Sequence, residues 1–257
     1  TMEIDPERLQ TIANEEKKGR FPDTKQVVAY EPDIQHKNIL TDEYLDYIKK
    51  IDPAICSSVG YTRLVNMNLL RQVGDKVVPV SITSGLSGMA NSRSLGTANG
   101  VSNMGVSSYP IQLNPSKGSY LERNYDVLAG KYPANKYELV LVVDSRNRVG
   151  TATLKALGFE VENGETIPFE EIIGTQFKLV DNNDYYVKTE AGAFLPVVNL
   201  PGADLQAVYE SDNNITLTIS GIVRQNPDTN IAILAPGLAY SDELSEEVIK
   251  RAMKSEI

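Results

Sequence analysis

The alternation of apolar and polar positions predicts a chain built from many short strands and helices. Along residues 215–223, isoleucine and leucine alternate with threonine and serine, which is typical of a half-buried strand. Between Glu138 and Asp144 every residue is apolar, without alternation, and this favours a strand over 138–144 that is buried on both faces. Along 59–69 the odd positions are apolar except for Arg63, which predicts a further half-buried strand.

Turn residues between apolar runs predict two hairpins. The stretch 72–75 contains a Gly-Asp pair typical of tight turns and lies just before the apolar run 77–82. The Asp- and Asn-rich stretch 181–184 separates the strand-like runs 176–180 and 185–188.

Helices are predicted where a capping residue precedes apolar positions at helical spacing. An Asp-Pro pair opens a short helix over 5–19, and a Thr-Asp pair opens another over 41–51. A strand is expected at 26–30, and a third helix at 151–157 is followed by Gly158, where a left-handed C-cap would lie.

The last predicted helix begins after Ser241 and carries acidic residues in its first turn and basic residues in its last. Glu246 and Glu247 stand four residues before Lys250 and Arg251, and these pairs are expected on the exposed side. The apolar face comprises Leu244, Val248, Ile249, Ala252 and Met253. No glycine or proline stops this helix before Ile257, so we expect the natural polypeptide to continue.

The middle of the chain differs in composition from both ends. Residues 81–120 contain no acid and only two basic residues, and they are rich in glycine and serine. We predict a long loop or connection over 83–109, with an irregular surface excursion as the alternative. Because strands and helices mix without a regular βαβα repeat, the predicted fold class is α+β.

Composition narrows the possible functions. The chain has 257 residues and a net charge of −9, and that charge argues against binding nucleic acid or an anionic membrane surface. A single cysteine, Cys56, and a single histidine, His36, exclude an internal disulfide and histidine-rich metal centres. The longest run of Leu, Ile and Val is 139–143, far too short to span a bilayer.

Residue patterns that could carry chemistry are weak. No phosphate-binding loop, dinucleotide fingerprint or nucleophile elbow is present, and nothing in the sequence brings His36 near Ser87. Two acidic stretches, 181–184 and 210–214, lack the ligand order of calcium loops and are interpreted as turns. Four tyrosines could form a sugar- or peptide-binding surface, although packing in the core and at its rim is the commoner use: Tyr120, Tyr125, Tyr132 and Tyr137.

The second half of the chain resembles the extracytoplasmic region of MacB/FtsX-like ABC transporter permeases, as found in Gram-positive bacteria. The pattern is a turn with Gly130 and Pro133, then Glu138 and an apolar strand. The likeness extends over 120–257 and is loose over 1–82. Further matching stretches are 154–159, 171–174, 218–224 and 235–240.

The resemblance implies a two-lobed α+β domain on the outer side of the cell membrane. One lobe would comprise 1–82 and 231–257, a flexible connection 83–109, and an inserted second lobe 110–230. Partners would be the transmembrane helices of the same permease chain, an ATP-binding subunit or domain acting through the membrane part, and a peptide or accessory protein. The family places no catalytic, cofactor-binding or metal-binding residue in this domain, so neither an enzyme nor a cofactor is expected.

Two other functions are compatible with the sequence alone. The first is a secreted module that binds glycans or peptides through the tyrosines of 120–137. The second is a hydrolase that uses paired carboxylates, although composition selects no particular pair among the 34 acids.

Overall fold

A computed structural model describes residues 41–61, 63, 65–80, 106–229 and 234–257. The chain separates into two compact units, 1–46 and 47–257. The predicted helix 5–19, the strand 26–30, His36, Ser87 and nearly all of the connection 83–109 lie outside the described residues. The predicted helix at 41–51 is present as α2 (Asp42–Lys49).

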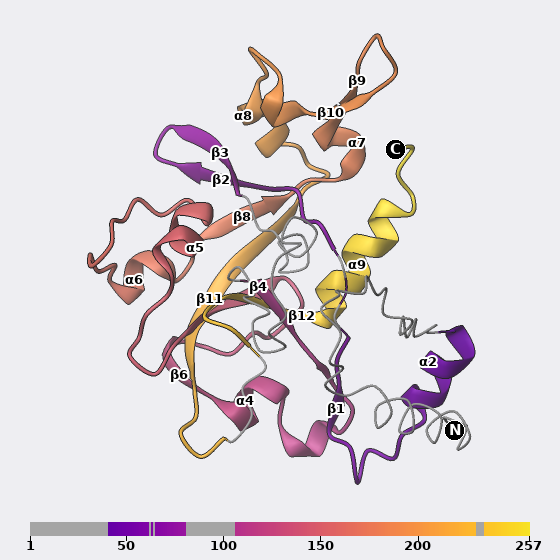
Figure 1. The fold of residues 1–257 in the computed structure, drawn as a ribbon, viewed down its shortest axis with the longest axis vertical. Coiled ribbons are helices and arrows are strands. Elements are labelled where there is room, and N and C mark those ends of the chain that lie inside the picture. The colour runs from indigo at the N-terminus through magenta and orange to yellow at the C-terminus, as the bar shows by residue number, and fades with distance from the viewer. Residues whose placement is uncertain (1–40, 62, 64, 81–105, 230–233) are drawn as a thin grey trace, which may run out of the picture. The chain divides into compact units, whose positions relative to one another are not determined.

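The main structure of residues 47–257 is a mixed sheet of eight strands (Figure 1). Seven strands follow the order β3-β2-β8-β11-β7-β12-β4, and β6 pairs with β11 beside β8. The strands are β2 (Leu69–Val73), β3 (Lys76–Val80), β4 (Val106–Tyr109), β6 (Tyr125–Gly130), β7 (Glu138–Val143), β8 (Gln176–Leu179), β11 (Ile215–Gln225) and β12 (Gly237–Ser241).

Strand β11 organises this sheet because it has neighbours along both edges. Along one edge it pairs in parallel with β7, from Thr218 to Arg224. Along the other it pairs first with β8 and then with β6, both antiparallel. The register shifts on both edges between Ile219 and Val223, where the neighbour along one edge changes from β8 to β6.

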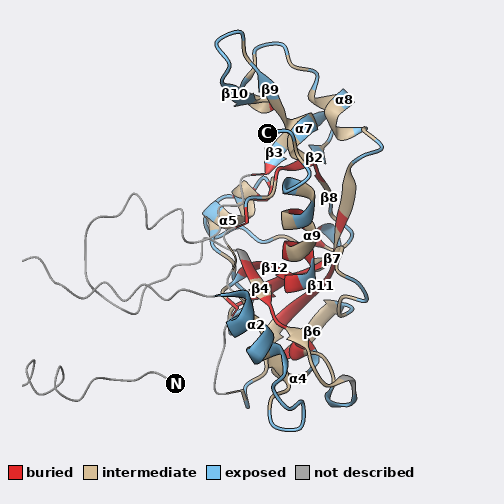
Figure 2. Ribbon diagram, turned by 90° about the vertical axis from the view of Figure 1, so that its right-hand side faces the viewer, coloured by how far each residue is buried: buried red, intermediate tan, exposed pale blue. Residues whose placement is uncertain are grey.

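Strand β7 contributes to two hydrophobic cores, one on each face of the sheet. Its odd positions pack into the larger core, and Val140 and Val142 pack into the smaller one. Five of its six residues are buried, so the strand predicted to be covered on both faces is confirmed. Figure 2 shows this buried material running through the middle of the sheet.

Helices cover both faces. The larger core receives Leu154, Ile172, Leu244 and Val248 from three helices, and the smaller core receives Leu121 from another. These helices are, in chain order, α4 (Tyr120–Asn124), α5 (Thr151–Ala156), α6 (Phe169–Ile172) and α9 (Asp242–Ala252). The helix predicted at 151–157 is confirmed, and Gly158 after it has a φ of 82°.

Smaller elements complete the unit. A two-stranded sheet joins β1 (Ser58–Val59) to β5 (Ile111–Gln112), and another joins β9 (Tyr186–Lys188) to β10 (Phe194–Pro196). Short helical turns lie at η1 (Pro115–Lys117), α7 (Asn182–Tyr185), η2 (Val197–Asn199) and α8 (Leu205–Tyr209).

Two predicted elements are wrong. Of the strand expected over 59–69, only the two ends are extended in sheets, and the described residues between them form no strand. The hairpin expected over 176–188 is absent as well, because β8 pairs with β2 and β11 while β9 pairs with β10. The hairpin of β2 and β3 is confirmed.

The fold class is α+β, as predicted. The main sheet takes β2, β3 and β12 from one predicted lobe and β6, β7, β8 and β11 from the other. The division into two lobes stays a prediction. Among the described residues, no helix is long and apolar enough to cross a membrane.

Candidate functional site

The strongest concentration of charged contacts lies around helix α9. At its start, the Nε of Arg63 lies 3.0 Å from Oδ1 of Asp242, and its Nη2 lies 3.0 Å from Oε1 of Glu246. Arg63 is the residue that interrupts the apolar alternation of 59–69. It serves to bind a helix that lies 179 residues later in the sequence.

Asp242 is fully buried, and the Arg63 guanidinium donates to both of its carboxylate oxygens. The hydrogen bond to Asp242 also raises the pKa of Arg63. Because a buried carboxylate is costly without a partner, this contact fixes the beginning of α9 against the segment that carries Arg63. Ser241 caps the helix by accepting a hydrogen bond from the Glu243 N–H, as the sequence predicted for its start.

Two further cations, Lys136 from outside the helix and Arg251 of α9 itself, form ion pairs at its later turns. Lys136 lies 3.1 Å from Glu247, and Arg251 lies 3.0 Å from Asp181 and 3.3 Å from Glu247. The contacts of Lys136, and next those of Arg251, lower the pKa of Glu247. The sequence predicted the pairing of Glu247 with Arg251 four residues on, but Glu247 is half-buried rather than exposed.

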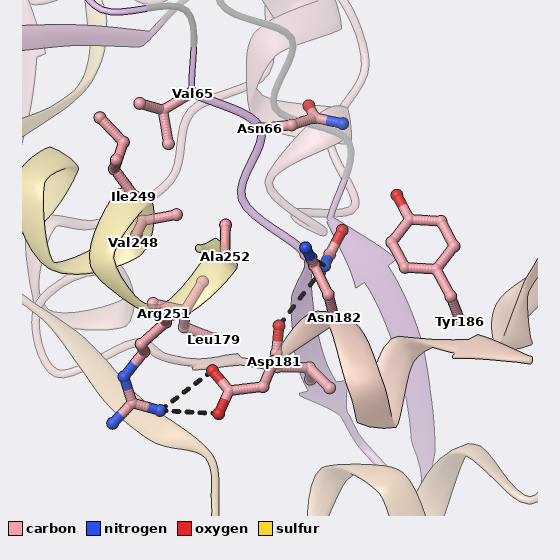
Figure 3. A pocket seen from close by; sticks show the side chains of 12 residues that line it. Val65, Asn66, Leu179, Asp181, Asn182, Tyr186, Val248, Ile249, Arg251 and Ala252 are labelled. Carbon is pink, nitrogen blue, oxygen red and sulfur yellow. Dashed lines mark hydrogen bonds and ion pairs between the residues drawn. The ribbon is translucent and has the colours of Figure 1, made fainter. Parts of the chain in front are cut away.

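A cavity of about 240 Å³ lies beside α9 (Figure 3). Arg251 and Asp181 face each other at its border, and Asn68 donates to Asn182 across 3.0 Å. The lining residues come from α9, from the segment before β2, and from β8 and α7: Val65, Asn66, Asn68, Leu179, Val180, Asp181, Asn182, Tyr186, Val248, Ile249, Arg251 and Ala252.

The described lining of the cavity provides groups suited to binding. Among these lining residues the one carboxylate is that of Asp181, which is held by Arg251, and none is a Ser, Cys or His. Apolar side chains and amide groups together suit a small amphipathic group. Among the described residues, no cluster of His, Cys, Asp or Glu could hold a metal ion.

A second cavity of about 580 Å³ lies where the parallel strands β7 and β11 end. It is bordered by Asp144, Ser145, Arg224 and Asn226. Asp144 accepts hydrogen bonds from Arg148, and Arg224 donates to Asn147. The charged groups at this edge therefore stabilise the turn after β7.

The glycine turn that carries the family resemblance packs directly on β11. Gly130 has a φ of 74°, and the Lys131 N–H donates to the Ser220 carbonyl at 3.0 Å. Glu138 accepts from the Ala134 N–H at 2.7 Å and from the Lys131 ammonium at 2.9 Å. Gly130 and Glu138, two residues of this pattern, thus stabilise one structural unit, the connection between β6 and β7.

The other sequence candidates are structural. Tyr120 and Tyr125 are buried, and the Tyr132 hydroxyl donates to the Tyr125 carbonyl, so these three tyrosines belong to the smaller core. Tyr137 packs against the larger core instead. Burial raises the pKa of Tyr125. The thiol of Cys56 donates to the carbonyl of Ser58.

The stretch 181–184 is a helical turn rather than a hairpin turn, and 210–214 is a turn between α8 and β11. Neither stretch is a metal cluster.

No family model, curated protein or solved structure matches this chain.

Proposed function

We propose that this chain is the noncatalytic extracytoplasmic domain of an ABC transporter permease, coupling ATP hydrolysis in the cytoplasm to substrate export or partner engagement outside the membrane. The proposal starts from the pattern of Gly130, Pro133 and Glu138 and from the stretches that follow it. The observation that carries it is the packing of this turn on β11, since it gives Gly130 and Glu138 of the pattern a shared structural reason.

The anchoring of α9 also supports a mechanical role. A coupling domain transmits displacement only if the helix near its membrane connection moves together with the sheet. Ionic contacts from three separate segments, at Arg63, Lys136 and Asp181, hold successive turns of this helix. Leu244 is fully buried against the larger core, so displacement of α9 would be passed to the sheet.

In this proposal the partners are transmembrane helices of the same polypeptide and an ATP-binding subunit or domain reached through them. The protein would lie at the cell membrane with this domain on the outer side. No cofactor or catalytic residue takes part, because force transmission requires none.

The full gene and the location of its product test the proposal. We expect apolar segments of about 20 residues before residue 1 and beyond residue 257. We also expect external protease to cleave the domain in intact, cell-wall-stripped cells. A gene that encodes a cleaved signal peptide and a stop codon after Ile257 would refute the proposal, as would protection from external protease.

The alternative module for glycans or peptides was motivated by the tyrosines of 120–137. Because two of these rings are buried and a third has its hydroxyl bonded to the backbone, no observation favours a binding surface there.

A further inference from the structure

Residues 181–214 form an acidic unit, which contains α7, β9, β10, η2 and α8. In Figure 1 it lies beyond the end of β8, away from β6 and α4. The unit carries six carboxylates and a single cation, Lys188, and thus a formal charge of −5 within a chain of −9. The carboxylates are those of Asp181, Asp184, Glu190, Asp204, Glu210 and Asp212.

Most of this negative charge is not neutralised within the described part of the chain. Asp181 is paired with Arg251, whereas the other five carboxylates form no ion pair there. Glu190, Asp204, Glu210 and Asp212 are exposed. The unit therefore presents a field that attracts cations and repels anions.

The same unit exposes apolar side chains on a small sheet. Val187 and Leu195 are directly opposite each other in the β9–β10 register and are 41% and 42% exposed. Residues opposite each other lie on one face of a sheet, so these two form one apolar patch. Phe194, 40% exposed, lies opposite Lys188 on the other face.

The edges of this sheet are also open. In the part of the chain that the structure describes, β9 and β10 pair only with each other. Strand β10 ends at Pro196, which has no backbone N–H. In β9 the Tyr186 N–H is already bonded to the Asn182 carbonyl, so the outward edge of β9 offers the Lys188 N–H and the carbonyls of Tyr186 and Lys188. Such an edge can accept an additional strand through main-chain hydrogen bonds.

We propose that β9 and its apolar patch bind an extended polypeptide in which basic and apolar side chains alternate. In a strand, alternate side chains point to one face, so apolar residues of the partner would cover Val187 and Leu195. Its basic residues would lie on the opposite face, which carries Lys188 and Phe194, and would be attracted by the unpaired carboxylates of the acidic unit rather than by β9 itself. This inference uses only the surface of the acidic unit and does not depend on the permease assignment.

Charge distinguishes this occupant from two others. A second copy of the chain would bring another charge of −5 against the first, and an anionic lipid surface would also be repelled. A cationic partner is attracted at long range, and its association would weaken as salt screens the field.

The test uses the full chain and a labelled synthetic peptide, acetyl-Lys-Val-Lys-Val-Lys-Val-Lys-amide, followed by fluorescence anisotropy. We expect saturable binding that weakens as sodium chloride rises, and no binding of the same peptide with glutamate in place of lysine. The double variant Val187→Ser/Leu195→Ser should weaken binding about tenfold or more.

The charge contribution is tested by Glu190→Gln/Asp212→Asn. This variant should weaken binding severalfold at low salt and little at high salt. The matched control, Glu160→Gln/Glu170→Gln, removes two exposed acids outside the acidic unit and should leave binding unchanged. Circular dichroism checks that each variant is folded.

Three results would overturn the proposal. One is the absence of saturable binding up to about 1 mM peptide, and another is binding that the apolar variant leaves unchanged. The third is that the double variant Val187→Ser/Leu195→Ser changes the sedimentation of the protein, or its binding to phosphatidylglycerol vesicles, but leaves peptide binding unchanged. That result would assign the patch to a second copy or to a lipid surface.

Discussion

Replacing Gly130 by alanine should strongly destabilise the protein. The loss should exceed that of the same replacement at a glycine whose φ is also positive but whose surroundings are open. A Cβ atom at Gly130 would lie 2.2 Å from the Ser220 carbonyl oxygen, and Gly130 has a φ of 74°. A Cβ atom at Gly221 would likewise lie 2.3 Å from the Lys131 carbonyl oxygen. The turn after β6 and strand β11 therefore approach each other backbone to backbone, with no room for a methyl group on either side.

The magnitude follows from three effects at Gly130. A methyl group in the left-handed region costs about 1–2 kcal/mol. Relieving a 2.2 Å contact requires the turn to move away from β11, and such overpacking costs about 1–3 kcal/mol. The same movement stretches the hydrogen bond from Lys131 to Ser220, which contributes about 1 kcal/mol. We expect a total loss of about 3 kcal/mol or more.

Two other glycines separate these effects. Gly164 has a φ of 90° and open space where its Cβ would stand, so Gly164→Ala reports the conformational cost alone. Gly221 does not have a positive φ, so Gly221→Ala reports the steric cost alone.

The assay is urea denaturation followed by circular dichroism. Free energies of unfolding are compared between variants whose unfolding free energy has the same dependence on urea concentration. If Gly130→Ala costs no more than Gly164→Ala, the close packing of this turn on β11 is wrong.

Three further predictions concern α9, the β6–β7 turn and the acidic stretch at 181. Val248→Asp would place an unpaired carboxylate in the larger core, so urea denaturation should show a loss of several kcal/mol of stability. Lys250→Gln, on the exposed side of α9, should change stability by about 0.5 kcal/mol or less. Equal effects of the two variants would show that α9 does not pack on the larger core. The hydrogen bond from the Ala134 N–H, and next that from Lys131, lowers the pKa of Glu138. The stabilisation that Glu138 provides is therefore present above its unfolded pKa of about 4.3 and is lost as pH falls through the lower folded pKa. Glu138→Gln should flatten this part of a curve of stability against pH, and an unchanged curve would contradict the prediction. Calcium titration by calorimetry should find no dissociation constant below about 10⁻⁵ M at 181–184, and a tighter site would contradict the interpretation of this stretch as a structural turn.

The elements that the sequence predicted correctly have a strong local signal. The apolar run of β7, the alternation of β11 and the cap at Ser241 each lie within a few neighbouring residues. Gly158 could likewise be placed because a left-handed C-cap has a local chemical requirement.

The elements that it missed depend on distant partners. The alternation of 59–69 predicted a strand, but Arg63 contacts Asp242 and the described residues between Val59 and Leu69 form no strand. The acidic stretch 181–184 looked like a hairpin turn, yet β8 finds its partners in β2 and β11 instead. Ala252 and Met253, at the end of the predicted apolar face of α9, are both exposed, which helical spacing does not report.

The cavity beside α9 could not be predicted from sequence spacing. Its ion pair joins Asp181 to Arg251, 70 residues apart, and Asn68 meets Asn182 across 114 residues. Neither pair forms a local pattern, because only the order of the strands brings them together.

The place of β11 in the sheet has a consequence for how the chain folds during synthesis. Strands β6, β7 and β8 all pair with β11, but residues 215–225 leave the ribosome after all three. Until then, their edges that face β11 have no native partner, and pairing among distant segments is slow. We therefore expect nascent chains that stop before residue 215 to be bound by chaperones and to be sensitive to protease. Chains extended far enough to release β11 should become resistant.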